Sequence, residues 1–235
     1  MIAGPATGGP GVGNPGSSNP AAINLGSGNS VTQDTVVGAA KRANIVTVGH
    51  SNHPIDQFIA LLKGAGVSRL VDIRSLRGSN HNPQFNQENL APSLEAAGIE
   101  YVTEPRLGGR RRASKGVPSN INGMWENASF HRYADYALGE DFAQGLMDLI
   151  HSSEDRALVE SPDQGTTAIM CSEAVWWRCH RRIVADHLLA QGTPVDHLMP
   201  SGKLTPAPLT KGAVVDERGV VTYPAEPDDT EGSKA

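Results

Sequence analysis

Short apolar runs alternate with helix-like segments along the middle of the chain, and this alternation restricts the possible folds more than any other feature. Segments with a helical spacing of apolar residues separate the runs. Such an alternation predicts an α/β fold, with a mostly parallel sheet of about five strands, helices on both faces and a small C-terminal hairpin. The predicted strands are residues 45–48, 70–73, 101–102, 167–170 and 195–199; the predicted helices are about 54–62, 86–97, 132–138, 140–151 and 178–191; the predicted hairpin is 214–221.

The two ends of the chain differ in composition from the middle. Residues 1–43 consist largely of Gly, Pro, Ser, Asn, Ala and Thr, and residues 224–235 are acidic and poor in apolar side chains. Such segments cannot bury enough apolar surface to offset the entropy lost on ordering, so both are predicted to be disordered tails. We therefore expect one α/β domain over residues 44–223 between two tails.

Charge and cysteine content restrict the setting and the partners. A formal net charge of −5 argues against a protein that coats nucleic acid nonspecifically. No apolar run approaches the roughly 20 residues of a membrane helix, so no membrane partner is expected. The chain has two cysteines and no secretory signal pattern, which favours a reduced, cytoplasmic setting. A disulfide between Cys171 and Cys179 is not expected, because a helix start would keep them apart.

The carboxyl ends of the predicted strands carry the candidate site. In open parallel sheets, ligands bind outside these ends. Four loop segments follow the strand ends and are expected to converge on one edge of the sheet. They are residues 49–52, residues 74–77, the loop at Arg110, and residues 171–173.

Cys171 is the candidate nucleophile. It directly follows the fourth predicted strand and precedes a predicted helix that opens with Arg178. A thiolate is stabilised near a helix N-terminus and guanidinium groups. The alternative is that Cys171 is a small buried apolar side chain, as most free cysteines are. Glu173 is a candidate general acid or base, or an ion-pair partner of Arg178 or Arg181, and the ion pair is slightly favoured.

Two further segments supply candidate site residues. His50 follows the first predicted strand and is a candidate proton carrier, while Ser51 is favoured as a helix cap and is also a candidate ligand contact. Asp72 lies inside an apolar strand, where a carboxylate needs a partner such as Arg74. That pair is either structural or presents Arg74 to an anionic ligand.

Arginine residues gather at the same predicted edge. They indicate a small anionic or nucleotide-like ligand, with nucleic acid as a further candidate partner. The alternative is a solvated basic loop that contacts no ligand. The candidate anion-binding residues are Arg74, Arg110, Arg178 and Arg181.

A metal site would combine Cys171, Cys179 and His180 with His50 or His53. Their spacing fits no familiar zinc pattern, so the sequence predicts neither a metal site nor another cofactor. Packed, hydrogen-bonded side chains are the favoured interpretation of Cys179 and His180.

Several ordered motifs resemble the domain of unknown function 488 family. The resemblance extends from about residue 45 to residue 223 and implies an α/β domain without an established activity. The motifs that carry it are Val46–His53, Val71–Arg74, Asn82–Asn86, Leu107–Arg110, Tyr133–Tyr136, Met170–Arg181 and Gly202–Thr205.

A weaker, local resemblance is to rhodanese-type and Cys-Arg phosphatase-type loops. In those loops a strand-end cysteine precedes an anion-binding loop and an arginine at a helix start, and Cys171 and Arg178 match this order. Residues 72–74 also resemble the strand-end Asp-x-Arg of rhodaneses. The loop differs, however, because it is one residue longer than in the phosphatases. It also carries Trp176 and Trp177 where a cradle of backbone N–H groups needs glycine.

We therefore expect a cysteine-dependent transferase or hydrolase that acts on an anionic, phosphate- or nucleotide-like substrate. Cys171 would be the nucleophile, and His50 or Glu173 would move protons. The alternative is a nucleic-acid or nucleotide-binding module without covalent chemistry, in which Cys171 only packs.

Overall fold

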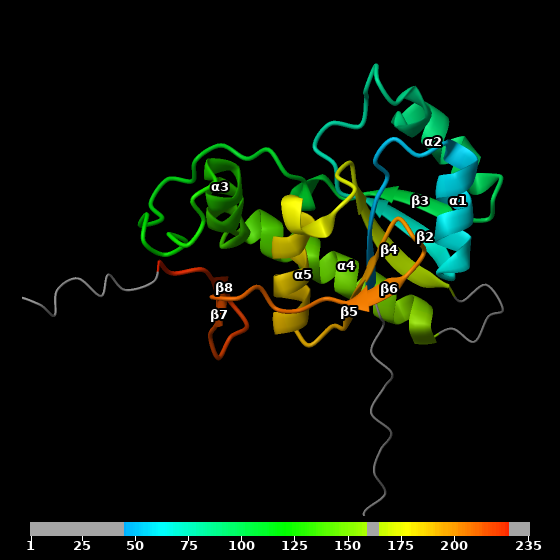
Figure 1. Cartoon of the computed structure of the whole chain (residues 1–235). Coiled ribbons are helices and arrows are strands. Elements are labelled where there is room, and N and C mark those ends of the chain that lie inside the picture. The colour runs from blue at the N-terminus through cyan, green and yellow to red at the C-terminus, as the bar shows by residue number, and fades with distance from the viewer. Residues whose placement is uncertain (1–44, 159–164, 226–235) are drawn as a thin grey trace, which may run out of the picture. The chain divides into compact units, whose positions relative to one another are not determined.

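The computed structural model describes residues 45–158 and 165–225. Its centre is a six-stranded sheet in the order β3-β2-β4-β1-β5-β6 (Figure 1). The first five strands pair in parallel, and β6 pairs with β5 in the antiparallel direction. The strands are β1 (Ile45–Gly49), β2 (Val67–Asp72), β3 (Glu100–Thr103), β4 (Thr166–Cys171), β5 (Val195–Leu198) and β6 (Leu204–Pro206).

Helices connect the parallel strands, and a separate hairpin lies near the C-terminal end of the described chain. The helices are α1 (Ile55–Gly64), α2 (Gln87–Glu95), α3 (Ala128–Ala137), α4 (Glu140–Leu158) and α5 (Arg181–Ala190). The short 3₁₀ turns are η1 (Pro83–Phe85), η2 (Pro105–Leu107) and η3 (Trp176–Arg178), and the hairpin strands are β7 (Val214–Val215) and β8 (Val221–Thr222).

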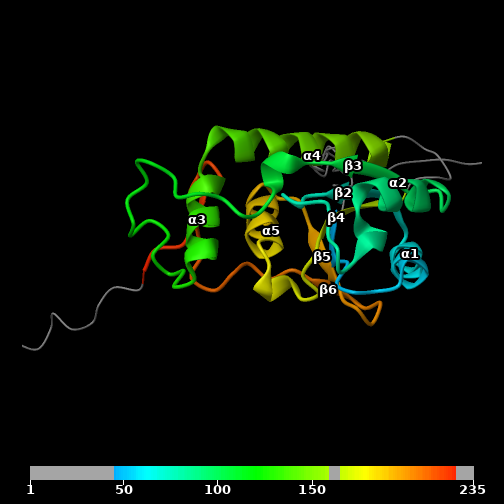
Figure 2. The ribbon, with the colours of Figure 1, turned by 90° about the horizontal axis from the view of Figure 1, so that it is seen from above.

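The sheet separates two apolar cores. Neighbouring residues of a strand point to opposite faces, so Ile45 and Val46 of β1 enter different cores. Ile45 packs in the core that includes Ile183 of α5, and Val46 packs in the core that includes Phe58 of α1. Both views show α5 and α1 on opposite sides of the strands (Figures 1 and 2). Because both faces are covered, the central strand β1 is buried along its whole length.

The predicted α/β fold, with its mostly parallel sheet and small C-terminal hairpin, is confirmed. The structure adds β6, which the sequence analysis did not predict. This edge strand is short and largely exposed, so its sequence lacks the apolar pattern of the other strands.

Two helix starts differ from the prediction. Helix α3 begins at Ala128, because the side chain of Asn127 accepts hydrogen bonds from the first backbone N–H groups. Helix α5 begins at Arg181, so the prediction that Arg178 opens this helix is wrong. Arg178 instead ends the η3 turn, and the extended backbone of Cys179 separates that turn from α5.

The predicted tails fall almost entirely outside the described part of the chain. Residues 1–43 and 226–235 are not described, and the domain boundaries stay predictions. Among the helices that the structure describes, none combines the length and apolar character needed to cross a membrane.

Candidate functional site

A cavity of about 340 Å³ opens at the carboxyl edge of the sheet, beyond the ends of β2 and β4. In the sheet, Gly49 pairs with Cys171 and Asp72 with Met170, so the loops that follow three adjacent strands start side by side. The predicted convergence therefore brings several candidate residues into one wall. Those that line the cavity are Arg74, Arg110, Cys171, Glu173 and Arg178.

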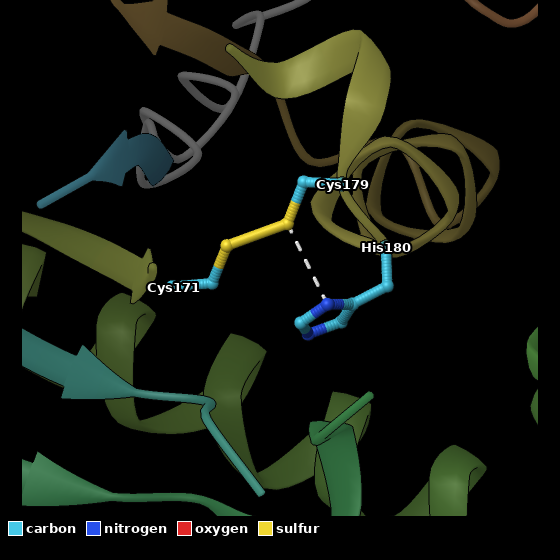
Figure 3. Close-up of side chains that lie close together, drawn as sticks. All are labelled: Cys171, Cys179 and His180. Carbon is cyan, nitrogen blue, oxygen red and sulfur yellow. Dashed lines mark hydrogen bonds between the residues drawn. A yellow bond between two sulfur atoms is a disulfide. The ribbon is translucent and has the colours of Figure 1, made fainter. Parts of the chain in front are cut away.

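Cys171 is joined to Cys179 by a disulfide (Figure 3). The expectation that the two cysteines stay apart is wrong. The physical reason is the η3 turn, in which the Cys179 N–H donates to the carbonyl of Trp176, so that the chain folds back over the end of β4. Both cysteines are buried, with 2% and 4% of their surfaces exposed, and their Cα atoms lie 7.8 Å apart.

His180 lies beside this pair. Its Nδ1 is 3.5 Å from the sulfur of Cys179, and the ligand atoms of the three side chains all lie within 4.8 Å of one another (Figure 3). The ring also faces Gly109, where a Cβ would approach Nδ1 to 2.9 Å. Burial, together with the charge of Arg181, lowers the pKa of His180 to about 4, so the ring is neutral at neutral pH.

Asp72 holds Arg74 in place at the rear of the cavity. The carboxylate of Asp72 accepts from Arg74 Nε at 2.9 Å and from Nη2 at 2.6 Å. Arg74 Nη2 also donates to the carbonyl of Phe85 at 2.8 Å. Asp72 is fully buried and does not line the cavity, whereas Arg74 does. The predicted pair is therefore present, and it fixes the direction of the Arg74 guanidinium.

His50 lies behind Arg74 and does not line the cavity. Its Nε2 is 3.1 Å from Arg74 Nη1, its Nδ1 donates to the carbonyl of Ser51 at 2.8 Å, and its ring stacks on Phe85. Burial and then the Arg74 charge lower the pKa of His50 to about 4. A neutral imidazole in this position accepts a hydrogen bond from Arg74, so His50 orients the arginine.

Ser51 lies outside the cavity wall as well. Its hydroxyl donates to the side-chain oxygen of Asn52 at 3.2 Å. Helix α1 has Pro54 at its N-cap and no side-chain cap bond, so the favoured capping role of Ser51 is wrong. The reason is that the helix starts only after Pro54, three residues beyond Ser51.

Arg181 does not line the cavity. It contacts the loop that follows Cys171, called the cysteine loop from here on. It is only 1% exposed, and its Nη2 donates to the backbone carbonyl of Glu173 at 2.7 Å. The same carbonyl lies so close to β1 that a Cβ at Gly49 would meet it at 1.8 Å. Gly49 and Arg181 together therefore fix the position of the loop that carries Glu173.

The Glu173 carboxylate faces solvent at the cavity wall. The slightly favoured ion pair with Arg178 or Arg181 is absent from the described part of the chain, so that prediction is wrong. The reason is that the Arg181 guanidinium donates to the backbone carbonyl of Glu173, whereas the Glu173 carboxylate lies at the cavity wall. The Glu173 N–H lies 3.4 Å from the sulfur of Cys171, within range of a weak hydrogen bond.

The arginine loop after η2 presents one arginine to the cavity. Arg110 is exposed and lines the wall, with a left-handed backbone at φ 58°. Arg111 is turned away, because its guanidinium donates to two carbonyl groups of η2 and to that of Gly108, and lies 3.8 Å from the centre of the Tyr136 ring. Arg111 thus anchors the loop, and Arg110 is the arginine that the loop contributes to the cavity wall.

Helix α3 supplies part of the cavity wall that the sequence analysis missed. The pattern Asn127-x-Ser129 signals a helix start, and Tyr133 belongs to a motif of the family resemblance, but neither feature shows which strand edge the helix faces. The lining residues from this region are Asn127, Ser129, Phe130 and Tyr133.

Comparison with known proteins places the chain in a family. No curated protein and no solved structure matches it. A family model matches residues 54–188, which is more than half of the chain and contains every cavity-lining residue named above. The match is shorter than the resemblance over residues 45–223, since it starts after β1 and ends within α5. By this match the chain belongs to the family described as Domain of unknown function DUF488.

Proposed function

We propose that the protein is an enzyme that acts on a small anionic, phosphate- or nucleotide-like substrate in the cavity. The observation that carries this proposal is the presence of Arg74, Arg110 and Arg178 in the same wall as Cys171. Guanidinium groups bind phosphate and carboxylate oxygens through paired N–H donors. A volume of about 340 Å³ falls in the range of small-molecule sites, about 300–1,000 Å³.

The charge of the wall supports an anionic substrate. The charge of Arg74 is balanced by Asp72. Within residues 45–158 and 165–225, neither Arg110 nor Arg178 forms an ion pair. Glu173 is the one carboxylate among the lining residues. Two guanidinium groups are thus available to an anion at this site, and Arg74 is already oriented toward it.

In the reduced protein, the sulfur of Cys171 is the proposed nucleophile. The thiolate forms a bond to an electrophilic atom of the substrate, while the leaving group departs with its bonding electron pair and takes a proton from Glu173. Water or a second acceptor then takes the group from sulfur and gives its proton to the Glu173 carboxylate, which restores the thiolate and gives a hydrolase or a transferase. A cytoplasmic setting belongs to the proposal, because a reducing compartment keeps the thiol free.

A nucleic-acid-binding module has less support. The arginine loop does not present a continuous basic surface, since Arg111 is bound to carbonyl groups of η2 and Gly108. The net charge of −5 also opposes nonspecific binding to a polyanion. Binding that falls steeply with salt and is unchanged in a Cys171→Ala variant would favour this alternative.

Thiol labelling tests the proposal. Cys179→Ser leaves Cys171 as the only thiol, since the chain has two cysteines, so labelling by iodoacetamide reports on that sulfur alone. We expect faster labelling than of free cysteine at neutral pH, and slower labelling when inorganic phosphate or pyrophosphate is added. Labelling as slow as that of free cysteine, or insensitive to both anions, would contradict the proposal.

A pair of arginine variants provides the matched comparison. Arg178→Gln should weaken pyrophosphate binding at least tenfold in calorimetry, because it removes an exposed guanidinium from the wall. Arg218→Gln removes an exposed guanidinium in the turn of the β7–β8 hairpin and should leave binding unchanged.

A further inference from the structure

We propose that the reduced protein binds one soft divalent metal ion, such as Zn²⁺, through Cys171, Cys179 and His180. The ligand atoms of these side chains, two sulfurs and a ring nitrogen, lie within 4.8 Å of one another. The two sulfurs face each other, and the ring of His180 points toward the sulfur of Cys179 (Figure 3). All three residues line the cavity. Thiolate and imidazole ligands are the set that zinc prefers in proteins.

The spacing of the two cysteines suits a metal bridge. A zinc ion lies about 2.3 Å from each sulfur, so a tetrahedral ion separates the two sulfurs by about 3.8 Å. A metal-bridged pair therefore spans a longer gap than a disulfide, whose Cα atoms are usually about 4.4–6.8 Å apart. The Cα atoms of Cys171 and Cys179 are 7.8 Å apart, beyond that range. In the reduced protein, a Cα separation of this size allows the two side chains to hold their sulfurs on either side of an ion.

The backbone directs two adjacent side chains to one point. Cys179 is extended, with φ −130° and ψ 149°, and His180 is already helical, with φ −57° and ψ −17°. This change of conformation between neighbours allows the sulfur of Cys179 and Nδ1 of His180 to approach within 3.5 Å. The third ligand, Cys171, comes from the end of β4.

The ring of His180 is placed as a ligand would be. By distance and angle, its Nε2 is buried without a hydrogen-bond partner among the described residues, and its Nδ1 lies 3.5 Å from the sulfur of Cys179. A metal on Nδ1 would occupy the side of the ring that faces Cys179 and leave Nε2 to a backbone acceptor. The carbonyl groups of Ile73 and Leu107 lie beside the ring. One of them is the acceptor that a ligating histidine normally uses for its second nitrogen.

The cavity side of the cluster is open to a fourth ligand. Three protein ligands with one open position are typical of reactive zinc sites, whereas structural sites close all four positions. The open side faces the wall that carries Arg110 and Arg178. A phosphate oxygen of an anion held there is the chemical class of ligand that suits this position.

This inference goes beyond the proposed function and can fail independently of it. An ion on both sulfurs makes Cys171 a ligand, so the thiolate attack belongs to the metal-free, reduced protein. Metal binding is measured without any substrate. A protein that binds the metal but no pyrophosphate would defeat the proposed function alone, and the reverse result would defeat the metal site alone.

Cobalt titration tests the site directly. The full chain, without an added histidine tag, is reduced, freed of metal and titrated with Co²⁺ under anaerobic conditions. We expect one ion per chain, with a sulfur-to-cobalt charge-transfer band and the visible absorption of a tetrahedral ion, and displacement of the cobalt by Zn²⁺. The oxidised protein should show neither band, because both sulfurs are consumed in the disulfide.

Variants identify the ligands. Cys171→Ser, Cys179→Ser and His180→Gln should each weaken cobalt binding at least tenfold. His81→Gln changes an exposed histidine outside the cavity and should have no effect. Equal cobalt binding in all four variants, or a wild-type spectrum without the charge-transfer band, would overturn the proposal.

A second readout uses only the wild-type protein, in case a variant does not fold. Zinc should protect both cysteines of the reduced chain from iodoacetamide, which mass spectrometry counts as two labels without the ion and none with it. Two labels in the presence of zinc would overturn the proposal.

Discussion

The imidazole of His50 lies behind Arg74 and accepts a hydrogen bond from its guanidinium, with 3.1 Å between Nε2 and Nη1. Together with the Asp72 carboxylate, this contact fixes the plane of the guanidinium that faces the cavity. His50 is therefore proposed as a positioning residue, which acts on an anionic ligand only through Arg74.

Removal of the His50 ring should weaken anion binding without removing a contact to the anion. His50→Ala is expected to lower the affinity for pyrophosphate several-fold, because Arg74 loses an acceptor and Phe85 loses its stacking partner at 4.1 Å. His50→Gln retains a hydrogen-bond acceptor and should recover most of the affinity. Calorimetry on both variants measures the effect. Equal affinities for His50→Ala and the wild type would show that Arg74 needs no such support.

The ion pair between Asp72 and Arg74 should dominate the stability of this region. Asp72→Ala leaves the Arg74 charge buried without its carboxylate, and breaking a buried pair in this way costs about 3–5 kcal/mol. Glu100→Gln removes a carboxylate from partly exposed pairs with Arg156 and Arg69 and should cost about 1 kcal/mol or less. Urea denaturation of the reduced proteins compares the two. A loss for Asp72→Ala as small as that for Glu100→Gln would contradict the assigned role.

Replacement by alanine should destabilise the protein at Gly49 but not at Gly64. A Cβ at Gly49 would lie 1.8 Å from the backbone carbonyl of Glu173, so Gly49→Ala must displace the cysteine loop. We expect a loss of about 1–3 kcal/mol, as for other overpacked sites, together with weaker pyrophosphate binding. At Gly64, in α1, a Cβ meets nothing within 4 Å, and alanine should stabilise the helix by up to about 1 kcal/mol. Denaturation and calorimetry on the pair check both effects, and tight anion binding by Gly49→Ala would count against the loop's role.

The fold was predictable because both faces of the sheet are covered. Residues 45–48 are mostly apolar, since β1 is buried along its whole length and its Ile45 and Val46 enter opposite cores. The same physical argument explains the missed strand, because β6 lies at an edge and needs no apolar pattern. The rule that ligands bind at the carboxyl ends of parallel strands also placed Arg74 and Cys171 correctly at one edge.

The details of the site depend on contacts between residues that are distant in the sequence. The η3 turn carries Trp176, which stacks on His197 of β5 with 4.3 Å between ring centres. No local pattern in the sequence reveals this stacking. The same η3 turn brings Cys179 back to Cys171. Likewise, His50 was predicted at the correct edge, but the side on which its ring packs depends on Phe85, which lies 35 positions further along the chain.

Buried histidines should make the folded state sensitive to mild acid. Burial lowers the pKa of His187 to about 4, whereas an unfolded histidine titrates near 6.5. Above pH 6.5 the ring is neutral in both states and contributes no pH dependence. Between pH 6.5 and about 4 the unfolded chain binds a proton that the folded chain does not, so the free energy of unfolding falls as the pH falls.

His187→Leu should therefore reduce this acid sensitivity. The ring of His187 packs edge-on against Phe142, and its Nε2 has no hydrogen-bond partner in the described chain, so an apolar side chain fits the site. Asp186 acts in the opposite direction, because burial raises its pKa, and it is present in both proteins. Urea denaturation of the reduced proteins at pH 7.5 and pH 5 gives the comparison. We expect a smaller loss of stability at pH 5 for the variant, and equal losses would show that His187 does not resist protonation in the folded state.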